Sequence, residues 1–302
     1  MKKQLSIILS VLILMTLSLS ACSSSGSGSG GSITIGTQTY TETKILAEMY
    51  KALIEDNTDV SVDIKTDLET SPVTLKAMQS GDIQMSTQYT GTALSAFFSI
   101  ENPKDPEATL KQAKEDFSGD KFNFKWFDSV GYANTYAFAV RDSLAEKYDL
   151  ETISDLKGKA NNMTAAFDTS WLERDNDGYD AFKNTYDLEF GKTRPMEIGL
   201  VYDAVKEKDV DIALAYSTDA RIEGFDLTIL EDNKQFFPPY DASPVVTQKA
   251  LDNNPGISDA IEPLLGKLDE AKMGKLNGKV DLDGKDPKDV ALNYLKDQGM
   301  LK

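Results

Sequence analysis

The chain has 302 residues, with 49 acidic and 32 basic side chains, a formal net charge of −17 and no histidine. The acidic balance excludes nucleic acid as a partner, because binding to phosphates requires a basic surface. The lack of histidine excludes Ser-His and Cys-His nucleophilic catalysis and every His-ligated metal site.

Residues 1–22 have the features of a lipoprotein signal peptide. Two lysines precede a short apolar run, and Leu-Ser-Ala then leads to Cys22, the single cysteine of the chain. A charged start, a short apolar core and small residues at the end are typical of a secretory signal. We expect Cys22 to carry a lipid that tethers the protein to the outer face of the cytoplasmic membrane. The alternative is an ordinary secreted protein with a cysteine at this position by chance.

Residues 23–32 are almost entirely Ser and Gly. This composition is typical of a flexible polar linker, here between the lipid anchor and the folded body. Because Cys22 is the only cysteine, no disulfide is expected in the body, and the core must provide its stability.

The body is predicted to begin with alternating strands and helices. The expected strands span 32–36, 60–64 and 81–89, and the helices that follow them span 41–56, 71–80 and 92–98. Thr39 and Glu42 have the spacing of a capping box, and Ser71 is predicted to cap the second helix ahead of Pro72. This order is typical of a mostly parallel sheet covered by helices on both faces.

The middle of the chain repeats the pattern after a crossing at 131–136. A helix over 106–117 and a strand over 122–129 come before the crossing. After it we expect an apolar run at 137–140 and strands over 163–167, 210–216 and 227–231. Helical segments are expected near 153–156, 179–186 and 201–206, and a loop is expected at 168–171.

The paired prolines within 236–246 fix an extended path, which we interpret as a second crossing back to the first lobe. Two or three helices and an acidic loop near 281–286 are expected to complete the chain. The predicted fold is therefore α/β with two lobes: 33–131 and 238–302 form lobe I, and 132–237 form lobe II. A cleft between such lobes closes on small ligands by hinge motion.

Four tyrosines occupy the positions from which side chains reach such a cleft. Tyr89 and Tyr216 end strands, and Tyr136 and Tyr240 lie beside the two crossings. Facing phenol rings attract a cation that cannot donate hydrogen bonds, at about 0.5–2 kcal/mol for each well-placed face, and a quaternary ammonium is the natural guest. The alternative is that some of these tyrosines only pack, since the chain has 12 tyrosines in all.

The polar loop after the first strand is a candidate site for a carboxylate, because the N-terminus of the following helix offers free N–H groups. Gln38 is the side chain best placed to help, and a solvated loop residue is its alternative. A metal site is not expected. Glu173, Asp175 and Asp177 resemble the start of a calcium loop, but the twelfth position is Asn184 instead of glutamate.

Five motifs together resemble the substrate-binding proteins of osmoprotectant ABC importers: TQYTGT, GYANTYAFAV, DTSW, ALAYSTD and FFPPYDASPVV. The nearest resemblance is to the OpuC/OpuB type, which takes up glycine betaine, carnitine, choline and relatives, and it covers the whole chain after the signal peptide. It implies a periplasmic-binding-protein-like fold of type II. It also implies that the site comprises Tyr89, Tyr136, Tyr216 and Tyr240 as a cage for the trimethylammonium head, with Gln38 and Thr92 on the carboxylate side.

Thr92 bears on ligand choice. Choline-restricted members of the resembled type have an acidic residue at this position, and a hydroxyl does not repel a betaine carboxylate as an aspartate would. Thr92 therefore indicates the broader, carboxylate-tolerant type.

The resemblance further implies a non-enzymatic protein without a cofactor. Its partners would be a permease and ATPase subunits, and its body would be a monomer, lipid-anchored outside a Gram-positive cell membrane.

Two alternative functions stay open. An extracellular enzyme would use Asp168 or Asp241 as acid and base. An amino-acid-binding protein would use an arginine clamp, for which Arg174, Arg194 and Arg221 are available, although none of them ends a predicted strand.

Overall fold

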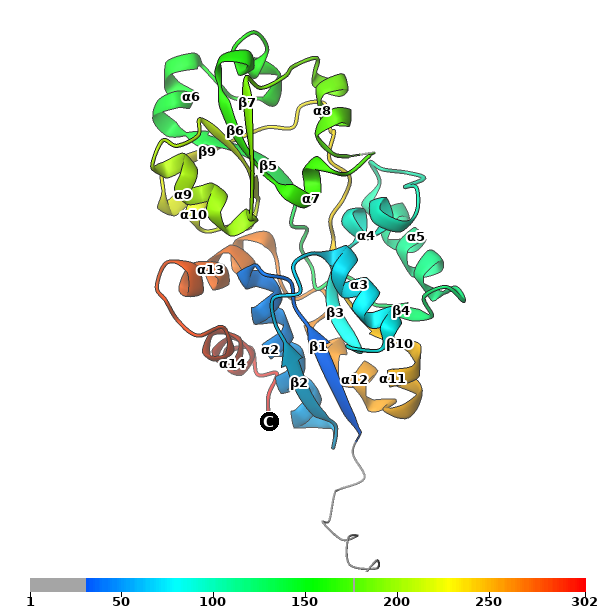
Figure 1. Ribbon diagram of the computed structural model, residues 1–302. Coiled ribbons are helices and arrows are strands. Elements are labelled where there is room, and N and C mark those ends of the chain that lie inside the picture. The colour runs from blue at the N-terminus through cyan, green and yellow to red at the C-terminus, as the bar shows by residue number, and fades with distance from the viewer. Residues whose placement is uncertain (1–30, 176) are drawn as a thin grey trace, which may run out of the picture. The chain divides into compact units, whose positions relative to one another are not determined.

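The computed structural model describes residues 31–175 and 177–302 (Figure 1). The predicted signal peptide with its Cys22, and the linker up to residue 30, lie outside the described residues. In the part of the chain that is described, no helix is both long enough and apolar enough to cross a membrane.

The first sheet has the strand order β2-β1-β3-β10-β4. Its strands are β1 (Ser32–Gly36), β2 (Ser61–Lys65), β3 (Met85–Tyr89), β4 (Phe124–Trp126) and β10 (Ala242–Thr247). β1 pairs in parallel with β2 and β3, whereas β10 is antiparallel to both β3 and β4. A strand from the last quarter of the chain thus lies between two strands from its first half.

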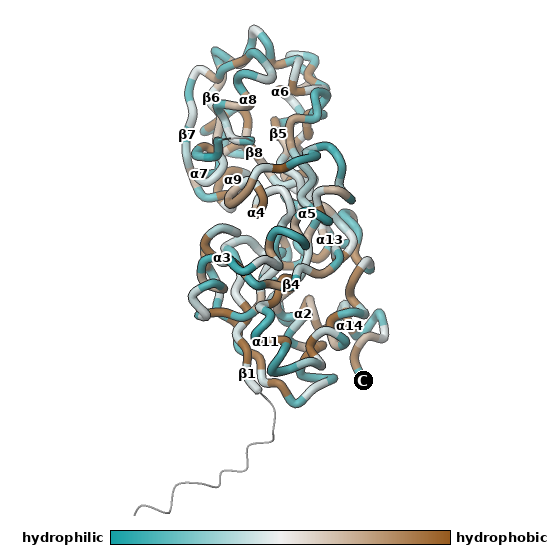
Figure 2. The backbone as a smooth tube through the Cα atoms, turned by 90° about the vertical axis from the view of Figure 1, so that its right-hand side faces the viewer, coloured by the Kyte–Doolittle hydropathy of each residue, from teal (hydrophilic) through white to brown (hydrophobic). Residues whose placement is uncertain are grey.

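Helices cover both faces of this sheet (Figure 1). They are α2 (Thr41–Asn57), α3 (Ser71–Ser80), α4 (Thr90–Phe97), α5 (Pro106–Ser118), α11 (Gln248–Asn253), α12 (Gly256–Ile261), α13 (Glu270–Asp281) and α14 (Pro287–Asp297). Val246 packs into the core with α2 and α12–α14, and Val245 packs into the separate core with α3–α5. This alternation follows from the two-residue period of a strand. Hydrophilic and hydrophobic stretches alternate along the helices, as amphipathic helices on a sheet require (Figure 2).

The second sheet has the order β7-β6-β8-β5-β9. Its strands are β5 (Tyr136–Arg141), β6 (Thr164–Asp168), β7 (Lys192–Met196), β8 (Ile212–Tyr216) and β9 (Leu227–Leu230). β6 is parallel to β7 and β8, and β5 is antiparallel to β8 and β9. The plan of the first sheet is repeated: three parallel strands, then an antiparallel strand that follows a crossing, then an edge strand. The predicted two-lobed α/β fold with two crossings is confirmed.

The helices of this sheet are short. They are α6 (Asp142–Tyr148), α7 (Thr169–Leu172), α8 (Tyr179–Tyr186), α9 (Val201–Lys206) and α10 (Arg221–Gly224), with 3₁₀ turns at Ile153–Leu156, Ala160–Asn162 and Ile198–Leu200. A further 3₁₀ turn lies at Glu262–Leu264 in the first lobe. Trp171 of α7 is fully buried and packs edge-on against the ring of Phe167.

Several local predictions were wrong. The capping box is not formed, because Tyr40 is the N-cap of α2 and makes no side-chain cap hydrogen bond. Ser71 is the first residue of α3, which follows Thr70 as N-cap. Residues 168–171 do not form a loop, since the Asp168 carboxylate accepts from the Ser170 N–H and caps α7. α4 begins at Thr90, two residues before the predicted start, and residues 248–302 hold four α-helices instead of two or three.

The chain from Gly31 to Lys302 forms one compact unit. The lobe boundaries at 131/132 and 237/238 therefore stay predictions. The strands themselves divide cleanly, with 32–126 and 242–247 in one sheet and 136–230 in the other.

Candidate ligand-binding site

A cavity of about 440 Å³ has walls from both lobes. Its lining includes the four tyrosines selected from the sequence, Tyr89, Tyr136, Tyr216 and Tyr240, and it also includes Thr92. The structure therefore brings five of the six predicted site residues to one cavity. Their role as ligand contacts stays a prediction.

Strand register explains why these tyrosines meet. Tyr136 begins β5 and pairs directly with Tyr216, which ends the antiparallel strand β8. Tyr89 ends β3 and pairs with Ala242, and Tyr240 lies two residues before this partner. Each ring therefore lies where a strand meets the edge of its sheet, which is the usual position for a ligand in an open α/β fold.

A fifth ring, Tyr40, joins the four into a continuous arc. The centroid distances along the arc are 6.1 Å for Tyr89–Tyr40, 5.1 Å for Tyr40–Tyr216, 5.3 Å for Tyr216–Tyr136 and 5.5 Å for Tyr136–Tyr240. Tyr40 lines the cavity and was missed in the sequence. Its position offered a signal, because it ends the loop after β1 in the same way that Tyr89 precedes α4.

The hydroxyls of three rings donate to carboxylates. Tyr89 Oη lies 2.5 Å from Glu42 Oε1, Tyr136 Oη lies 3.2 Å from Asp168 Oδ2, and Tyr240 Oη lies 2.8 Å from Asp177 Oδ2. Burial raises the pKa of all three phenols above the usual range, and the neighbouring carboxylates act in the same direction. These phenols therefore keep their protons and remain donors.

Arg174 stands beside the arc, although it does not end a strand. Its Cζ lies 5.0 Å from the ring centroid of Tyr136 and 6.0 Å from that of Tyr240. Its Nη2 lies 3.1 Å from Asp177 Oδ2, whereas Nε and Nη1 are buried without a hydrogen-bond partner among the described residues. As expected from the sequence, Arg174 does not end a strand, and it is not part of the described cavity lining.

The structure does not bring Gln38 to the cavity wall. Gln38 is fully buried, and its Nε2 donates to Ser71 Oγ at 3.1 Å and to Thr87 O at 3.2 Å. Ser71 does line the cavity. The Gln38 amide therefore supports a wall residue instead of forming the wall.

The charge of the lining favours a cation. Among the described residues that line the cavity, Glu69, Asp168, Glu173 and Glu197 are acidic and none is basic. Asp241, named with Asp168 in the enzyme alternative, is not part of this lining. Asp177 of the calcium-like segment is paired with Arg174, and residues 31–175 and 177–302 contain no cluster of three acidic or cysteine side chains placed to hold a metal.

Gly91 allows α4 to approach the second crossing. A Cβ on Gly91 would lie 2.6 Å from Pro239 O and 2.9 Å from ring atoms of Tyr240. Gly91→Ala is therefore expected to displace this segment and to lower the free energy of unfolding by about 1–3 kcal/mol. Urea unfolding measures the change. Gly199→Ala is the matched control, because a Cβ there meets nothing within 4 Å. Equal unfolding free energies for the two variants would contradict the prediction.

Comparison with known proteins shows which family the chain belongs to. Residues 31–297 match the family model described as the substrate binding domain of ABC-type glycine betaine transport systems. The carnitine transport binding protein OpuCC of Listeria monocytogenes is 44% identical over 262 residues, which cover 86% of this chain and 85% of that protein.

Two further similarities support the same assignment. A glycine-betaine-binding protein of Pseudomonas aeruginosa is 29% identical, over 88% of each chain. A crystal structure described as a glycine betaine/carnitine/choline ABC transporter superimposes with a TM-score of 0.74 at 38% identity, over 90% of this chain and all of that one. The chain therefore belongs to the family of substrate-binding domains of ABC-type glycine betaine transport systems.

Proposed function

We propose that the chain captures a quaternary-ammonium compatible solute, such as glycine betaine, carnitine or choline, in the tyrosine-lined cavity. The observation that carries the proposal is the arc of five adjacent phenol rings above an acidic lining. A trimethylammonium group has no N–H to donate, so ring faces and diffuse negative charge suit it better than individual acceptors do.

The ring end of the cavity would hold the methylated nitrogen. Tyr89, Tyr136, Tyr216 and Tyr240 would form the cage, with Tyr40 as a fifth wall. Each well-placed face contributes about 0.5–2 kcal/mol, and the contribution is largest when the cation is fully desolvated. The rings come from both lobes, so closure of the lobes on the ligand would complete this desolvation.

The opposite end would hold a carboxylate where the ligand has one. The N–H groups of Thr90 and Gly91 already donate to Asp241 O and Pro239 O, so Thr92 is the residue of this helical turn that offers its hydroxyl to the ligand. Gln38 would act through Ser71, whose hydroxyl it orients.

The family works with membrane permease and ATPase subunits, to which the closed, loaded protein would deliver its ligand. In this scheme the binding protein catalyses no reaction and needs no cofactor. We propose that a lipid on Cys22 anchors the protein to the extracytoplasmic face of a Gram-positive cell membrane. We also propose that the folded body is a monomer. The linker up to residue 32 would let it reach the permease.

Isothermal titration of the purified protein with glycine betaine, carnitine, choline, glycine and proline tests this function. We expect saturable 1:1 binding of at least one trimethylammonium compound and no binding of glycine. Proline is the matched control for glycine betaine, because it is a zwitterion of the same net charge whose nitrogen carries no methyl groups. Tight binding of an amino acid, with none of the three trimethylammonium compounds bound, would favour the arginine-clamp alternative and contradict the proposal.

A further inference from the structure

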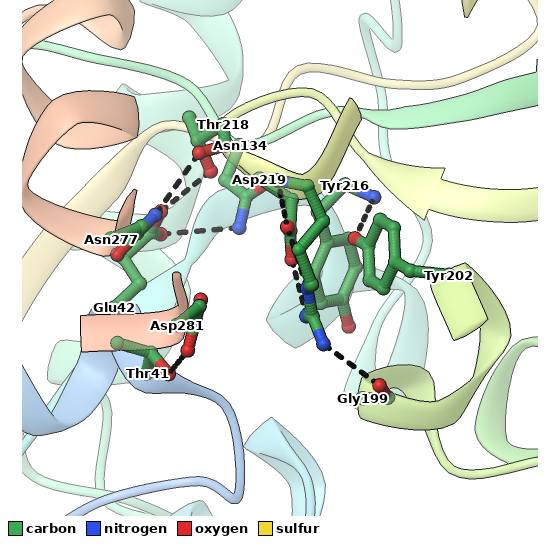
Figure 3. A network of polar contacts seen from close by, with 11 residues as sticks. Thr41, Glu42, Asn134, Gly199, Tyr202, Tyr216, Thr218, Asp219, Asn277 and Asp281 are labelled. Atoms are coloured by element: carbon green, nitrogen blue, oxygen red, sulfur yellow. Dashed lines mark hydrogen bonds and ion pairs between the residues drawn. The ribbon is translucent and has the colours of Figure 1, made fainter. Parts of the chain in front are cut away.

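Glu42 is a buried carboxylate that lies behind the cavity instead of lining it. Only 2% of its surface is exposed, and it belongs to α2 of the first lobe. Four side chains donate to it: Tyr89 at 2.5 Å, Thr218 at 2.6 Å, Asn134 at 3.1 Å and Asn277 at 3.4 Å. Figure 3 shows Thr218, Asn134 and Asn277, which come from separate segments of the chain, beside Glu42.

These four donors fit an ionised carboxylate. Each oxygen of Glu42 accepts two hydrogen bonds, and hydroxyl and amide N–H groups can supply them without a proton from Glu42. Burial raises the pKa of the Glu42 carboxyl, and the hydrogen bonds from Thr218 and Tyr89 oppose this effect because they stabilise the charged form. A group with such partners can hold a negative charge directly behind the Tyr89 ring.

The same arrangement recurs at two other rings. Tyr136 donates to Asp168, which is 8% exposed, and Tyr240 donates to Asp177, which is 4% exposed. Thus three phenols of the arc donate to a buried carboxylate, and Asp168 is the one of these three that also lines the cavity. The guanidinium of Arg174 offsets one of these three charges, because it is paired with Asp177.

A phenol that donates to an anion has a more electron-rich ring, because the hydrogen bond moves electron density from the O–H bond toward the oxygen and the ring. The anion also attracts a bound cation through a medium of low dielectric constant, where Coulomb interactions are stronger than in water. Neither effect acts on an uncharged guest of the same shape.

We propose that Glu42 and Asp177, which do not line the cavity, and Asp168, which does, form an anionic shell around the rings. This shell makes the cage select for positive charge and not only for the shape of three methyl groups. This inference rests on the proposed function and deepens it. Glu42 is a positioning residue in this scheme, since it acts on the ligand through Tyr89.

The test compares choline with 3,3-dimethylbutan-1-ol, in which a carbon replaces the quaternary nitrogen and removes the charge. Both affinities are measured at pH 8 by ligand-observed NMR competition, for the wild-type protein and for Glu42→Gln. We expect Glu42→Gln to weaken choline by about tenfold, the scale of one removed charge at short range. Binding of the uncharged alcohol should change by less than about twofold, because its contacts are with ring faces.

Two further variants keep the test decisive. Tyr89→Phe retains the ring and Glu42 but removes the hydrogen bond, so it should lower the ratio of choline to alcohol affinity in the same sense. Thr218→Ala keeps every ring but removes a donor that stabilises the ionised form of Glu42, so it should lower this ratio in the same sense and by less than Glu42→Gln does. Equal losses for choline and the alcohol in Glu42→Gln and in Tyr89→Phe would mean a purely structural role and would overturn the inference.

The wild-type result separates this inference from the proposed function. If the wild-type protein binds no trimethylammonium compound, the proposed function fails and the anionic shell fails with it. If the wild-type protein binds choline and the ratio does not move in either variant, only the shell is lost.

Discussion

Replacing Tyr216 by alanine is expected to weaken glycine betaine binding by about 100-fold. Tyr216 is the middle ring of the arc, with centroids 5.1 Å from Tyr40 and 5.3 Å from Tyr136. Its loss removes one cation–π face, up to about 2 kcal/mol in a desolvated site. It also releases two aromatic neighbours, each pair being worth about 0.5–1.5 kcal/mol. A 100-fold increase in the dissociation constant corresponds to a loss of about 2.7 kcal/mol of binding free energy, which lies within the sum of these two contributions.

Two control variants isolate the ring from general damage to the fold. Tyr216→Phe keeps the face and should bind glycine betaine within about threefold of the wild-type protein. Tyr186→Ala removes another buried tyrosine of the second lobe that does not line the cavity, so it should lower stability and leave affinity intact. Calorimetric titration of folded protein measures all three. If Tyr216→Ala bound glycine betaine as tightly as the wild-type protein, Tyr216 would not be a cage residue.

Local sequence patterns were sufficient to predict helices and strands whose buried residues recur with the period of that element. The predicted helices at 179–186 and 201–206 match α8 and α9, and the apolar run ending at Tyr216 is β8. β7 was missed because Lys192–Met196 is an exposed edge strand with a proline and no apolar alternation. Only pairing with β6 makes it a strand, and this pairing cannot be read from the five residues alone.

Four of the five rings that line the cavity could be predicted, whereas Tyr40 and the carboxylates that accept from the rings could not. Two of these four tyrosines end a strand, one begins a strand and Tyr240 lies two residues before one, so their places at a sheet edge follow from local sequence and register. Glu42 instead meets partners that are 47, 92, 176 and 235 positions away in the chain. Its spacing from Thr39 suggested a helix cap, but tertiary donors hold the carboxylate elsewhere. The place of Arg174 beside the Tyr136 ring likewise depends on tertiary packing, because Arg174 does not end a strand.

Thr92→Asp is expected to weaken the binding of glycine betaine, which has a carboxylate, and not the binding of choline, which has none. Thr92 lines the cavity in the first turn of α4, where we place the carboxylate of the ligand. Two like charges about 4 Å apart repel by about 4 kcal/mol at an effective dielectric constant of ~20. Partial exposure reduces this repulsion, so we expect glycine betaine to lose about 30- to 100-fold in affinity. Choline has no carboxylate, and its affinity should stay equal or rise.

The ratio of the two dissociation constants, measured in one buffer by calorimetry, is the result that matters. Thr92→Asn is the control for size and for loss of the hydroxyl, because its side chain is similar to aspartate in volume and carries no charge. It should change the ratio by less than about threefold, since a neutral amide can still donate to a carboxylate. Parallel losses of glycine betaine and choline in Thr92→Asp would place the carboxylate away from α4.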